Sequence, residues 1–381
     1  MKVLFVLEYF YPHVGGVETS FLNLARELAK HNDVMVITSW IPGTDLQEVY
    51  EKINILRVKT PSYARRFWFT IISLKTLLKL AGNFDYIHTT AYNAALPAWL
   101  VSKILKKRIV ITVPEVFGKN WFNLGERNMF LNTFFYLYEQ ILFRLPFDLY
   151  IAISRSTKKD LLRNFKIDQK KVRIIYCILD LDFWNPRKYN GNKIRKKLEL
   201  NDKFVYLYYG RPGISKGLEY LLMAVHDISI SIPNSLLMLI LSNDPRNRYE
   251  MMKDIIEKEK ISDSVLLLES LNYRDLPYYI AAADCVVVPS LTEGFGYSAI
   301  ESAIMDKIVI STKVGAIPEL NPNGFFIKAK SSRTIANSLS LVVNNKKNSN
   351  NIRKRLIRIL DRENILDNYL RSVRAILSNR C

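Results

Sequence analysis

The sequence predicts an α/β protein with two Rossmann-like, doubly wound domains in tandem. Short segments rich in Val, Ile and Leu alternate with longer segments of helical periodicity, a pattern typical of parallel sheets covered by helices on both faces. The chain has 381 residues, too many for one ordinary core, so two domains of roughly 150–200 residues each are expected. A polar, basic and turn-rich stretch at 180–203 separates the two runs, and we divide the chain into 1–185 and 186–361.

The expected strands are short apolar runs, and the segments between them have the spacing of helices. In the first half the strands are expected at 3–7, 34–38, 53–58, 86–88, 109–113 and 148–153, with helices at 16–30, 68–81, 93–105 and 127–144. In the second half they are expected at 204–209, 236–241, 265–268, 285–288 and 308–311, with helices from 217 and over 246–259, 275–283 and 296–305. A last helix at 364–378 has no strand after it.

Composition narrows the class of protein. No apolar run approaches the ~18 residues that span a bilayer, and Glu8 interrupts the first apolar run too early for a signal peptide. Three widely spaced cysteines, Cys177, Cys285 and Cys381, have no metal-ligand spacing and fit reduced thiols in the cytoplasm. We therefore expect a cytoplasmic, globular protein.

The chain is strongly basic, with 55 Lys and Arg against 36 Asp and Glu, a formal charge of +19. Residues 1–180 hold 25 basic and 15 acidic residues (+10), which leaves +9 for the rest, so the excess is spread along the chain. An anionic membrane or a phosphorylated small molecule would explain this charge. No nucleic-acid-binding motif accompanies it, and we expect no nucleic-acid partner.

Three loops follow expected strands. Gly15 and Gly16 open the first helix, where free N–H groups favour an anion, although a tight turn without a ligand fits equally well. The second loop is GRPGISKG at 210–217, in which Arg211 and Lys216 suit a diphosphate at the carboxyl end of a strand. The alternative for this pair is two exposed basic residues in an ordinary loop.

The third loop, PSLTEGFGYSAIE at 289–301, is the most specific of the three. Glu293 lies in the loop between a strand and a helix, and Glu301 lies on that helix after seven intervening residues. Gly294 and Gly296 allow unusual backbone angles between the two carboxylates. A carboxylate at 301 can accept two hydrogen bonds from a vicinal diol such as a ribose, whereas the spacing alone also fits two surface glutamates.

With these residues the chain resembles the retaining glycosyltransferases of family 4, which have the GT-B fold of two Rossmann-like domains facing across a cleft. The resemblance covers nearly the whole chain, through GGVE at 15–18, GRPGISKG, the Glu-x7-Glu element at 289–301 and GAIPEL at 315–320. It implies that the last helix, about 362–381, returns to the first domain. It also implies an enzyme that transfers a sugar from a nucleotide-diphosphate donor, with UDP or GDP as the nucleotide.

The resemblance also implies residue roles. Arg211, Lys216 and Glu293 are the expected catalytic residues, with Arg211 and Lys216 on the diphosphate, so no metal or further cofactor is required. Glu301 is expected on the ribose, and Gly16 is expected to approach the diphosphate from the first domain. The full donor-binding set is Gly15, Gly16, Gly210, Arg211, Lys216, Glu293, Gly294, Phe295, Gly296, Tyr297 and Glu301.

The sequence departs from the family pattern at three places. Pro114 and Glu115 stand where many relatives have a sugar-binding His, Cys177 to Asp180 replace a common Asn-Gly segment, and Ala316 replaces a second glycine after Gly315. These departures leave the transferred sugar undetermined.

The acceptor is expected to be a saccharide or a lipid-linked precursor in glycan biosynthesis. Residues 62–80 combine Arg65, Arg66 and Lys75 with Trp68 and many aliphatics, and such a segment can lie on an anionic membrane surface. The aromatic segment 121–147 is a second candidate for an acceptor groove, and for both segments an ordinary core helix is the alternative. We expect a peripheral protein at the inner face of the plasma membrane. The alternative function is a nucleotide-sugar epimerase, hydrolase or non-catalytic sensor.

Overall fold

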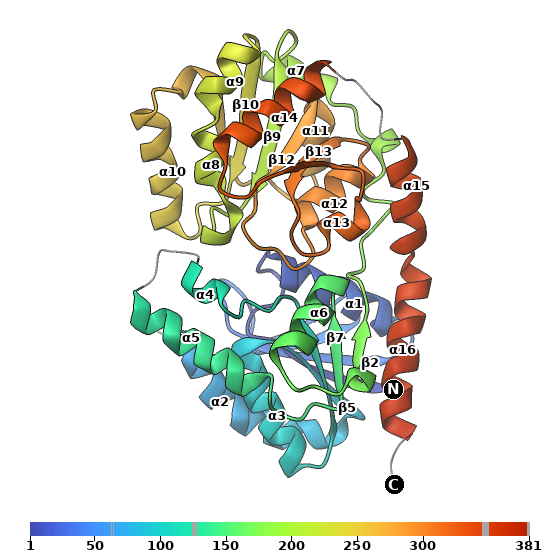
Figure 1. Ribbon diagram of the computed structural model, residues 1–381. Coiled ribbons are helices and arrows are strands. Elements are labelled where there is room, and N and C mark those ends of the chain that lie inside the picture. Colours follow the sequence, from blue (N-terminus) through green and yellow to red (C-terminus); the bar gives the residue numbers. More distant parts are fainter. Residues whose placement is uncertain (62, 64, 124–127, 345–349, 379–381) are drawn as a thin grey trace. The chain divides into compact units, whose positions relative to one another are not determined.

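The computed structural model describes residues 1–61, 63, 65–123, 128–344 and 350–378 (Figure 1). The chain forms two compact units, each with its own hydrophobic core. Unit 1 comprises Met1–Leu179 and Leu360–Cys381, and unit 2 comprises Asp180–Ile359. The division falls at 179/180 instead of 185/186 because Trp184 is fully buried and Phe183 stacks on Tyr273 of unit 2, with ring centroids 5.0 Å apart.

Unit 1 is built on a sheet whose described strands follow the order β3-β4-β2-β1-β5-β6-β7-β8. All neighbouring strands run parallel except β3, which is antiparallel to β4 at the edge. The strands are β1 (Lys2–Val6), β2 (Asp33–Ser39), β3 (Gln47–Tyr50), β4 (Ile53–Val58), β5 (Tyr86–Thr90), β6 (Arg108–Val113), β7 (Leu149–Ala152) and β8 (Val172–Ile174).

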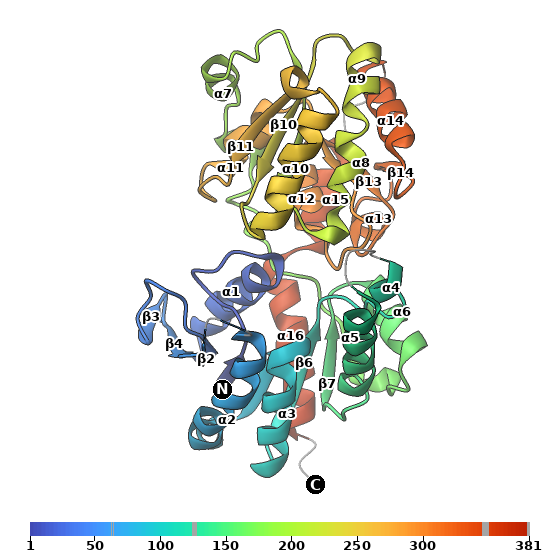
Figure 2. The same ribbon diagram turned by 90° about the vertical axis from the view of Figure 1, so that its left-hand side faces the viewer.

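Helices cover both faces of this sheet, with α1 and α16 on one face and α2, α3 and α5 on the other (Figures 1 and 2). The unit 1 helices are α1 (Gly16–Ala29), α2 (Arg65–Leu80), α3 (Ala95–Ile104), α4 (Asn120–Asn123), α5 (Met129–Leu142), α6 (Arg155–Asn164) and α16 (Arg362–Ser378). Helix α16 packs against β6 and β7, so the last helix belongs to unit 1.

A buried polar cluster joins α16 to the sheet. The Tyr369 hydroxyl lies 2.8 Å from Nδ1 of His88 and 3.0 Å from the hydroxyl of Tyr86, and Nε2 of His88 lies 2.8 Å from Oγ1 of Thr112. All four side chains are buried, so the hydrogen bonds replace those to water that burial removes. The cluster therefore holds α16, which comes late in the sequence, to β5, a strand from the first half of the chain.

Unit 2 has a second sheet, in which every described strand pairing is parallel and the order is β11-β10-β9-β12-β13-β14. The strands are β9 (Phe204–Gly210), β10 (Ser235–Leu241), β11 (Val265–Glu269), β12 (Cys285–Val288), β13 (Ile308–Thr312) and β14 (Phe325–Ile327). The helices are α7 (Asn192–Lys197), α8 (Leu218–Leu222), α9 (Val225–Ser231), α10 (Arg246–Lys258), α11 (Leu276–Ala282), α12 (Tyr297–Ile304), α13 (Ile317–Leu320), α14 (Ser332–Asn344) and α15 (Asn350–Ile359).

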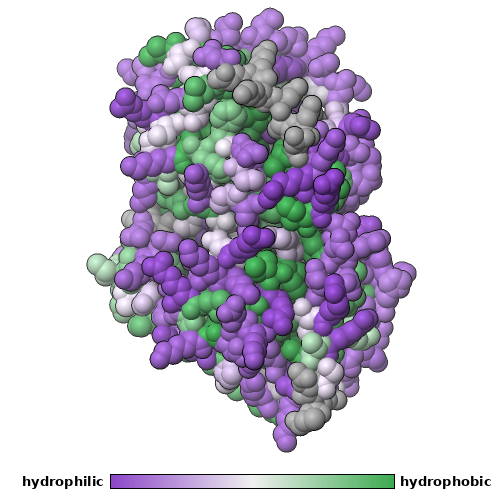
Figure 3. Space-filling view, turned by 45° about the vertical axis from the view of Figure 1, so that its right-hand side comes forward, coloured by the Kyte–Doolittle hydropathy of each residue, from purple (hydrophilic) through white to green (hydrophobic). Residues whose placement is uncertain are grey.

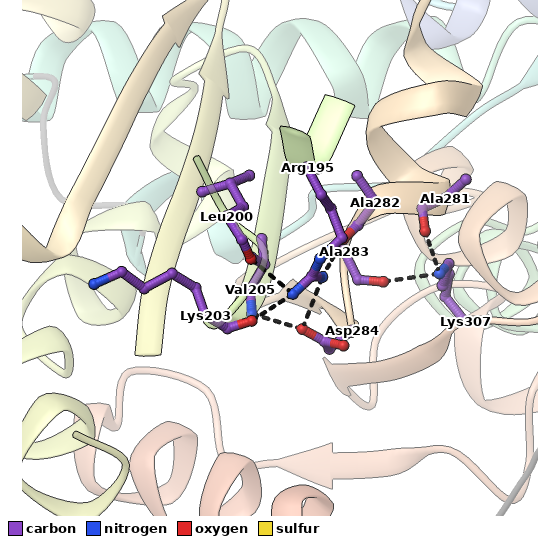
Figure 4. A network of polar contacts seen from close by, with 9 residues as sticks. All are labelled: Arg195, Leu200, Lys203, Val205, Ala281, Ala282, Ala283, Asp284 and Lys307. Carbon is purple, nitrogen blue, oxygen red and sulfur yellow. Dashed lines mark hydrogen bonds and ion pairs between the residues drawn. The ribbon is translucent and has the colours of Figure 1, made fainter. Parts of the chain in front are cut away.

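A network at the amino ends of the unit 2 strands holds the first helix of the unit (Figure 4). Arg195 of α7 donates to the carbonyls of Ala282, Leu200 and Lys203 at 2.7, 3.0 and 2.5 Å, and it pairs with Asp284 at 3.3 Å. Lys307 donates to the carbonyl of Ala281, near the end of α11, and to that of Ala283, just after it, at 2.8 Å each. Basic residues therefore act as structural donors at this edge of the sheet.

The sequence-predicted strands and helices occur in the structure with ends shifted by a few residues. The strands β3, β8 and β14 were not predicted, since each has only three or four residues and gives little periodicity. Among the described helices, none is both long and apolar enough to cross a membrane.

Candidate active site

Two loops of unit 2 are joined at the carboxyl ends of β9 and β12. The backbone N–H of Leu291 donates to the carbonyl of Ser215 at 2.6 Å. Gly217 has a φ of 62°, and a Cβ there would lie 2.3 Å from the carbonyl oxygen of Pro289. Only glycine allows this approach, because a side chain would collide with backbone as well as strain φ. The loops 210–217 and 289–296 thus form one structure.

An ion pair connects two side chains of these loops that the sequence predicts for the site. Lys216 Nζ lies 2.6 Å from Glu293 Oε1, and Ser290 Oγ donates to the same oxygen at 2.9 Å. The Glu293 side chain is 11% exposed and that of Lys216 is 32% exposed, so the pair is reachable from solvent. Two residues predicted for the site from separate motifs are therefore in direct contact.

A third loop, which follows β13, contacts the backbone of the loop that carries Glu293. The N–H of Ala316 donates to the carbonyl of Gly294 at 3.0 Å. Gly315 has a φ of 56°, and a Cβ there would lie 2.3 Å from the carbonyl oxygen of Glu293. The GAIPEL segment therefore fixes the backbone of Glu293 and Gly294. Ala316 has helical backbone angles and is fully buried, so the structure accommodates alanine where the family pattern has a second glycine.

Arg248 is a site-supporting residue that sequence reasoning missed. Its buried guanidinium, on α10, donates from Nε to the carbonyl of Pro212 at 3.1 Å and forms a close ion pair with Glu219 of α8. These contacts tie α10 to Pro212 in the 210–217 loop and to Glu219 in the helix that follows the loop. Arg211, at the start of the loop, is exposed, and its carbonyl accepts from the Tyr208 hydroxyl at 3.4 Å.

Glu301 lies on α12 and is buried, as a residue that faces the sheet. Its Oε2 accepts from the hydroxyl of Tyr209 at 3.0 Å, and that hydroxyl lies 3.0 Å from the carbonyl of Ser298. Burial raises the pKa of Glu301 to about 7, and the hydrogen bond from Tyr209 opposes the shift. The carboxyl group can therefore change protonation near neutral pH when a ligand changes its surroundings.

The segment between the two glutamates contributes backbone more than side chains. Phe295 is buried and its ring packs on that of Tyr297, with centroids 5.0 Å apart. Gly296 has a φ of 79° and precedes the first residue of α12. The first turn of a helix has N–H groups without partners inside the helix, so these residues offer donors for an anion.

In unit 1, Gly15 precedes α1 with extended backbone at a φ of −167°, and Gly16 is exposed. Neither glycine has a positive φ, so the backbone here does not require glycine for its conformation. Trp68 on α2 is half-buried and meets Tyr63 edge-on at 6.2 Å, and Lys75 is exposed. The side chains of Arg65 and Arg66 lie outside the described part of the structure.

Comparison with known proteins gives the class of the chain. Residues 14–183 match the family model described as Glycosyltransferase Family 4, and residues 190–358 match that of Glycosyl transferases group 1. Similar solved structures include sucrose-phosphate synthase of Thermosynechococcus elongatus, with a TM-score of 0.84, 18% identity and coverage of 99% and 100% of the two chains. Anabaena HepE in complex with UDP and glucose has a TM-score of 0.79, 18% identity and coverage of 98% and 100%. The fold is GT-B, and the protein is a glycosyltransferase.

The relatives in sequence agree with this class. The GPI3 subunit of phosphatidylinositol N-acetylglucosaminyltransferase from Saccharomyces cerevisiae is 22% identical over 86% of this chain and 72% of its own length. An uncharacterised glycosyltransferase of Methanocaldococcus jannaschii is 26% identical over 88% of this chain and 87% of its own. With the two family models on its two halves, the chain is a GT-B glycosyltransferase of the family 4 type.

Proposed function

We propose that this enzyme transfers a sugar, with retention of configuration and without a metal ion, from a nucleotide-diphosphate sugar to a lipid-linked acceptor. The observation that supports this best is the contact of Lys216 with Glu293, because it brings a cation and a carboxylate from two loops to one edge of the unit 2 sheet. Ligands of α/β sheets bind at this edge. HepE, a neighbour in fold, is known in complex with UDP, so UDP sugars are the first donors to test.

In the proposed donor complex, Lys216 and Arg211 contact the diphosphate and Glu301 contacts the ribose. The cations stabilise negative charge as it develops on the leaving diphosphate, which lowers the barrier without a metal. Glu293, released from part of its contact with Lys216, is free to accept a hydrogen bond from a hydroxyl of the transferred sugar. The N–H groups before α12 donate to phosphate oxygens.

The proposed step exchanges one bond at the anomeric carbon for another. The bond from that carbon to the diphosphate oxygen breaks, and a bond to the acceptor hydroxyl oxygen forms on the same face of the sugar. The proton of the acceptor hydroxyl passes to the leaving phosphate oxygen, so the products are the glycosylated acceptor and a free nucleoside diphosphate. Positioning of donor and acceptor supplies the remaining acceleration.

The acceptor proposal has support from the yeast relative, whose name includes phosphatidylinositol, a membrane lipid. We propose that the enzyme acts at the cytoplasmic face of the membrane, where its charge of +19 would meet anionic lipids. The donor screen is also the test of the sugar, because Pro114 and Glu115 stand where many family members have a sugar-binding His.

The experiment is a screen of UDP and GDP sugars by thermal shift, because a ligand of the folded state raises its melting temperature with concentration. Each stabilising donor is then incubated with and without a total lipid extract, and free nucleoside diphosphate is measured. Release that requires the extract supports the transferase. Release without any acceptor indicates a hydrolase, and stabilisation without release under any condition indicates a sensor.

A further inference from the structure

Helix α5 of unit 1 exposes apolar side chains along one face, and two of its three buried residues are polar. Phe130, Phe134, Leu137 and Ile141 recur at the spacing of one helix face, and all four are exposed, Phe130 by 78%. On the opposite side of α5, Asn132 and Glu139 are buried. Glu139 accepts hydrogen bonds from the N–H groups of Phe117 and Gly118 at 2.9 and 2.7 Å. The helix is therefore fixed in this orientation by its polar side.

The exposed apolar surface continues onto the two neighbouring helices. Phe67 of α2 lies beside Phe134 of α5, with ring centroids 6.1 Å apart, and α2 packs on α3. Ile71 of α2 and Ile104 of α3 are also exposed. Figure 2 shows α2, α3 and α5 side by side on one face of the unit 1 sheet. We call the exposed apolar side chains of these three helices the apolar face.

Helix α16, on the other face of the unit 1 sheet, differs from these three helices in its exposed side chains. The exposed residues of α16 include Glu363, Asp367, Asn368 and Arg371, and none of its exposed side chains is a large apolar one. Figure 3, which is turned toward the side that includes α16, shows hydrophilic residues with hydrophobic ones between them. Contiguous apolar patches of this kind mark interaction sites in soluble proteins. The apolar face thus distinguishes α2, α3 and α5 from α16.

The exposed charges on the helices of the apolar face have one sign. Lys75 and Lys79 of α2 and Lys103 of α3 are exposed next to its apolar residues. Within the three helix segments 65–80, 95–104 and 129–142, the one acidic residue is Glu139, and it is buried. The surface therefore combines apolar side chains with lysines and has no exposed carboxylate on these helices.

We propose that the apolar face docks unit 1 onto an anionic lipid bilayer. Aromatic and aliphatic side chains would enter the boundary between headgroups and acyl chains, while the lysines meet anionic headgroups. Lysine is depleted in the cores of protein–protein interfaces, whereas its long stem lets it lie along an apolar surface with its amine in the headgroup layer. The observed mixture therefore fits a bilayer better than a protein partner.

This proposal rests on the proposed lipid-linked acceptor. It also explains how such an acceptor would reach unit 1 from the membrane. Helices α2 and α5 lead into the amino ends of β5 and β7, so their first residues, near Phe67 and Phe130, lie toward the carboxyl edge of the unit 1 sheet. Ligands of such sheets bind at that edge. A lipid held in the bilayer beside this edge would present its headgroup to unit 1 without leaving the membrane.

The test is flotation of the full chain with vesicles of phosphatidylcholine, with or without about 30% phosphatidylglycerol. The variant is Leu137→Glu/Ile141→Glu, and the matched control is Leu341→Glu/Ile230→Glu on helices of unit 2. The paired residues are equally exposed, at 53% and 52% for the leucines and 63% and 68% for the isoleucines. We expect the wild type and the control to float with anionic vesicles, and the variant to bind at least about tenfold more weakly.

The lysines are tested separately with Lys75→Glu/Lys103→Glu. We expect this variant to lose binding to anionic vesicles, and salt at about 0.5 M to weaken wild-type binding, because exposed charges are screened. Equal flotation of the wild type and the Leu137→Glu/Ile141→Glu variant would overturn the docking site. So would a wild type that does not bind vesicles, or an apolar face that instead mediates self-association, seen as a change in mass of the variant by light scattering.

Nucleotide-sugar binding by thermal shift, measured on the same samples, separates this proposal from the proposed function. Loss of vesicle binding by a variant that still binds a donor concerns the docking site alone. A wild type that binds vesicles but no nucleotide sugar would contradict the proposed function and leave the docking surface supported.

Discussion

Lys216 Nζ lies 2.6 Å from Glu293 Oε1, although 77 residues separate them in sequence. The contact depends on the close backbone approach at Gly217 and on the hydrogen bond from Leu291 to Ser215. One loop supplies the cation and the other the carboxylate, so neither motif forms the site alone. In the proposed donor complex, a diphosphate would compete with this carboxylate for the lysine.

The first prediction concerns that lysine. Lys216→Ala should lower turnover by at least about 100-fold, because it removes a positive charge from the leaving diphosphate. Its effect on stability should stay below about 1 kcal/mol, because the Lys216 side chain is 32% exposed and Glu293 keeps its hydrogen bond from Ser290. Turnover and urea unfolding of the same preparation check both parts. Lys253→Ala is the control, as it breaks an exposed pair with Glu250 on α10 and should leave turnover unchanged. Full activity of Lys216→Ala would contradict its catalytic role.

The second prediction concerns the pH dependence of donor binding through Glu301, whose pKa is raised to about 7 by burial. A ribose that donates hydrogen bonds to the carboxylate favours its ionised form, so the pKa is lower in the complex than in the free enzyme. Binding then releases a proton, and donor affinity should increase with pH up to about 7 and level off above it. Titration calorimetry between pH 5.5 and 8.5 measures this.

Glu301→Gln is the matched variant, since it keeps the shape of the side chain and cannot titrate. It should bind the donor more weakly by a few kcal/mol at most and lose the pH dependence. An unchanged affinity at pH 8 would remove Glu301 from the ribose-binding role.

Local features of the candidate site could be predicted from the sequence, whereas contacts between distant segments could not. The loops 210–217 and 289–301 are continuous in sequence and follow apolar strands, so their place at strand ends could be predicted and is confirmed, while their chemistry stays a prediction. Tyr209 was read only as a strand residue, because nothing local shows that its hydroxyl reaches Glu301 on α12. Its contact depends on the pairing of β9 with β12, which is non-local.

Arg248 could have been found. It lies four and eight residues before Met252 and Ile256, which are both buried, so helical spacing puts it on the buried face of α10. A basic residue on the apolar side of a helix needs a partner, here Glu219. The orientation of α5 could not have been predicted from the sequence. Both sides of that helix have apolar residues, and periodicity alone does not tell which side meets the sheet.

The third prediction tests Arg248 as a positioning residue. Arg248→Met should destabilise unit 2 by about 3–5 kcal/mol, since it leaves the Glu219 carboxylate without its partner in a partly buried place. The double variant Arg248→Met/Glu219→Gln removes both charges and should recover much of that stability while donor binding stays weaker, because the Pro212 carbonyl loses its hydrogen bond. Urea unfolding and donor titration are the measurements.

Arg246→Met is the control on the same helix, as Arg246 is exposed and pairs loosely with Glu250 at 3.8 Å. We expect it to change neither stability nor binding. If the double variant bound the donor as tightly as the wild type, Arg248 would have no part in positioning the loop.

The fourth prediction concerns acid stability through His88. Burial lowers its pKa to about 3 from an ordinary value of 6.5, so between these values the unfolded chain binds one proton that the folded chain does not. Stability from this group is therefore present above pH 6.5 and is lost as the pH falls, by about 1.4 kcal/mol per pH unit. Unfolding by urea at pH 7.5 and 5.5 should show a smaller loss in His88→Gln than in the wild type. His226→Gln, at an exposed histidine of unit 2, should behave as the wild type does.

Tyr369→Phe separates the cluster's hydrogen bonds from its titration. The variant keeps the ring and removes the hydroxyl that lies near both His88 and Tyr86, which leaves buried polar atoms without a partner and should cost about 1–3 kcal/mol at pH 7.5. Because the lost bond joins α16 to β5, amide hydrogen exchange should increase in α16 more than in α1. Equal exchange in both helices would show that apolar packing of Ile365 and Val373 alone holds α16 to unit 1.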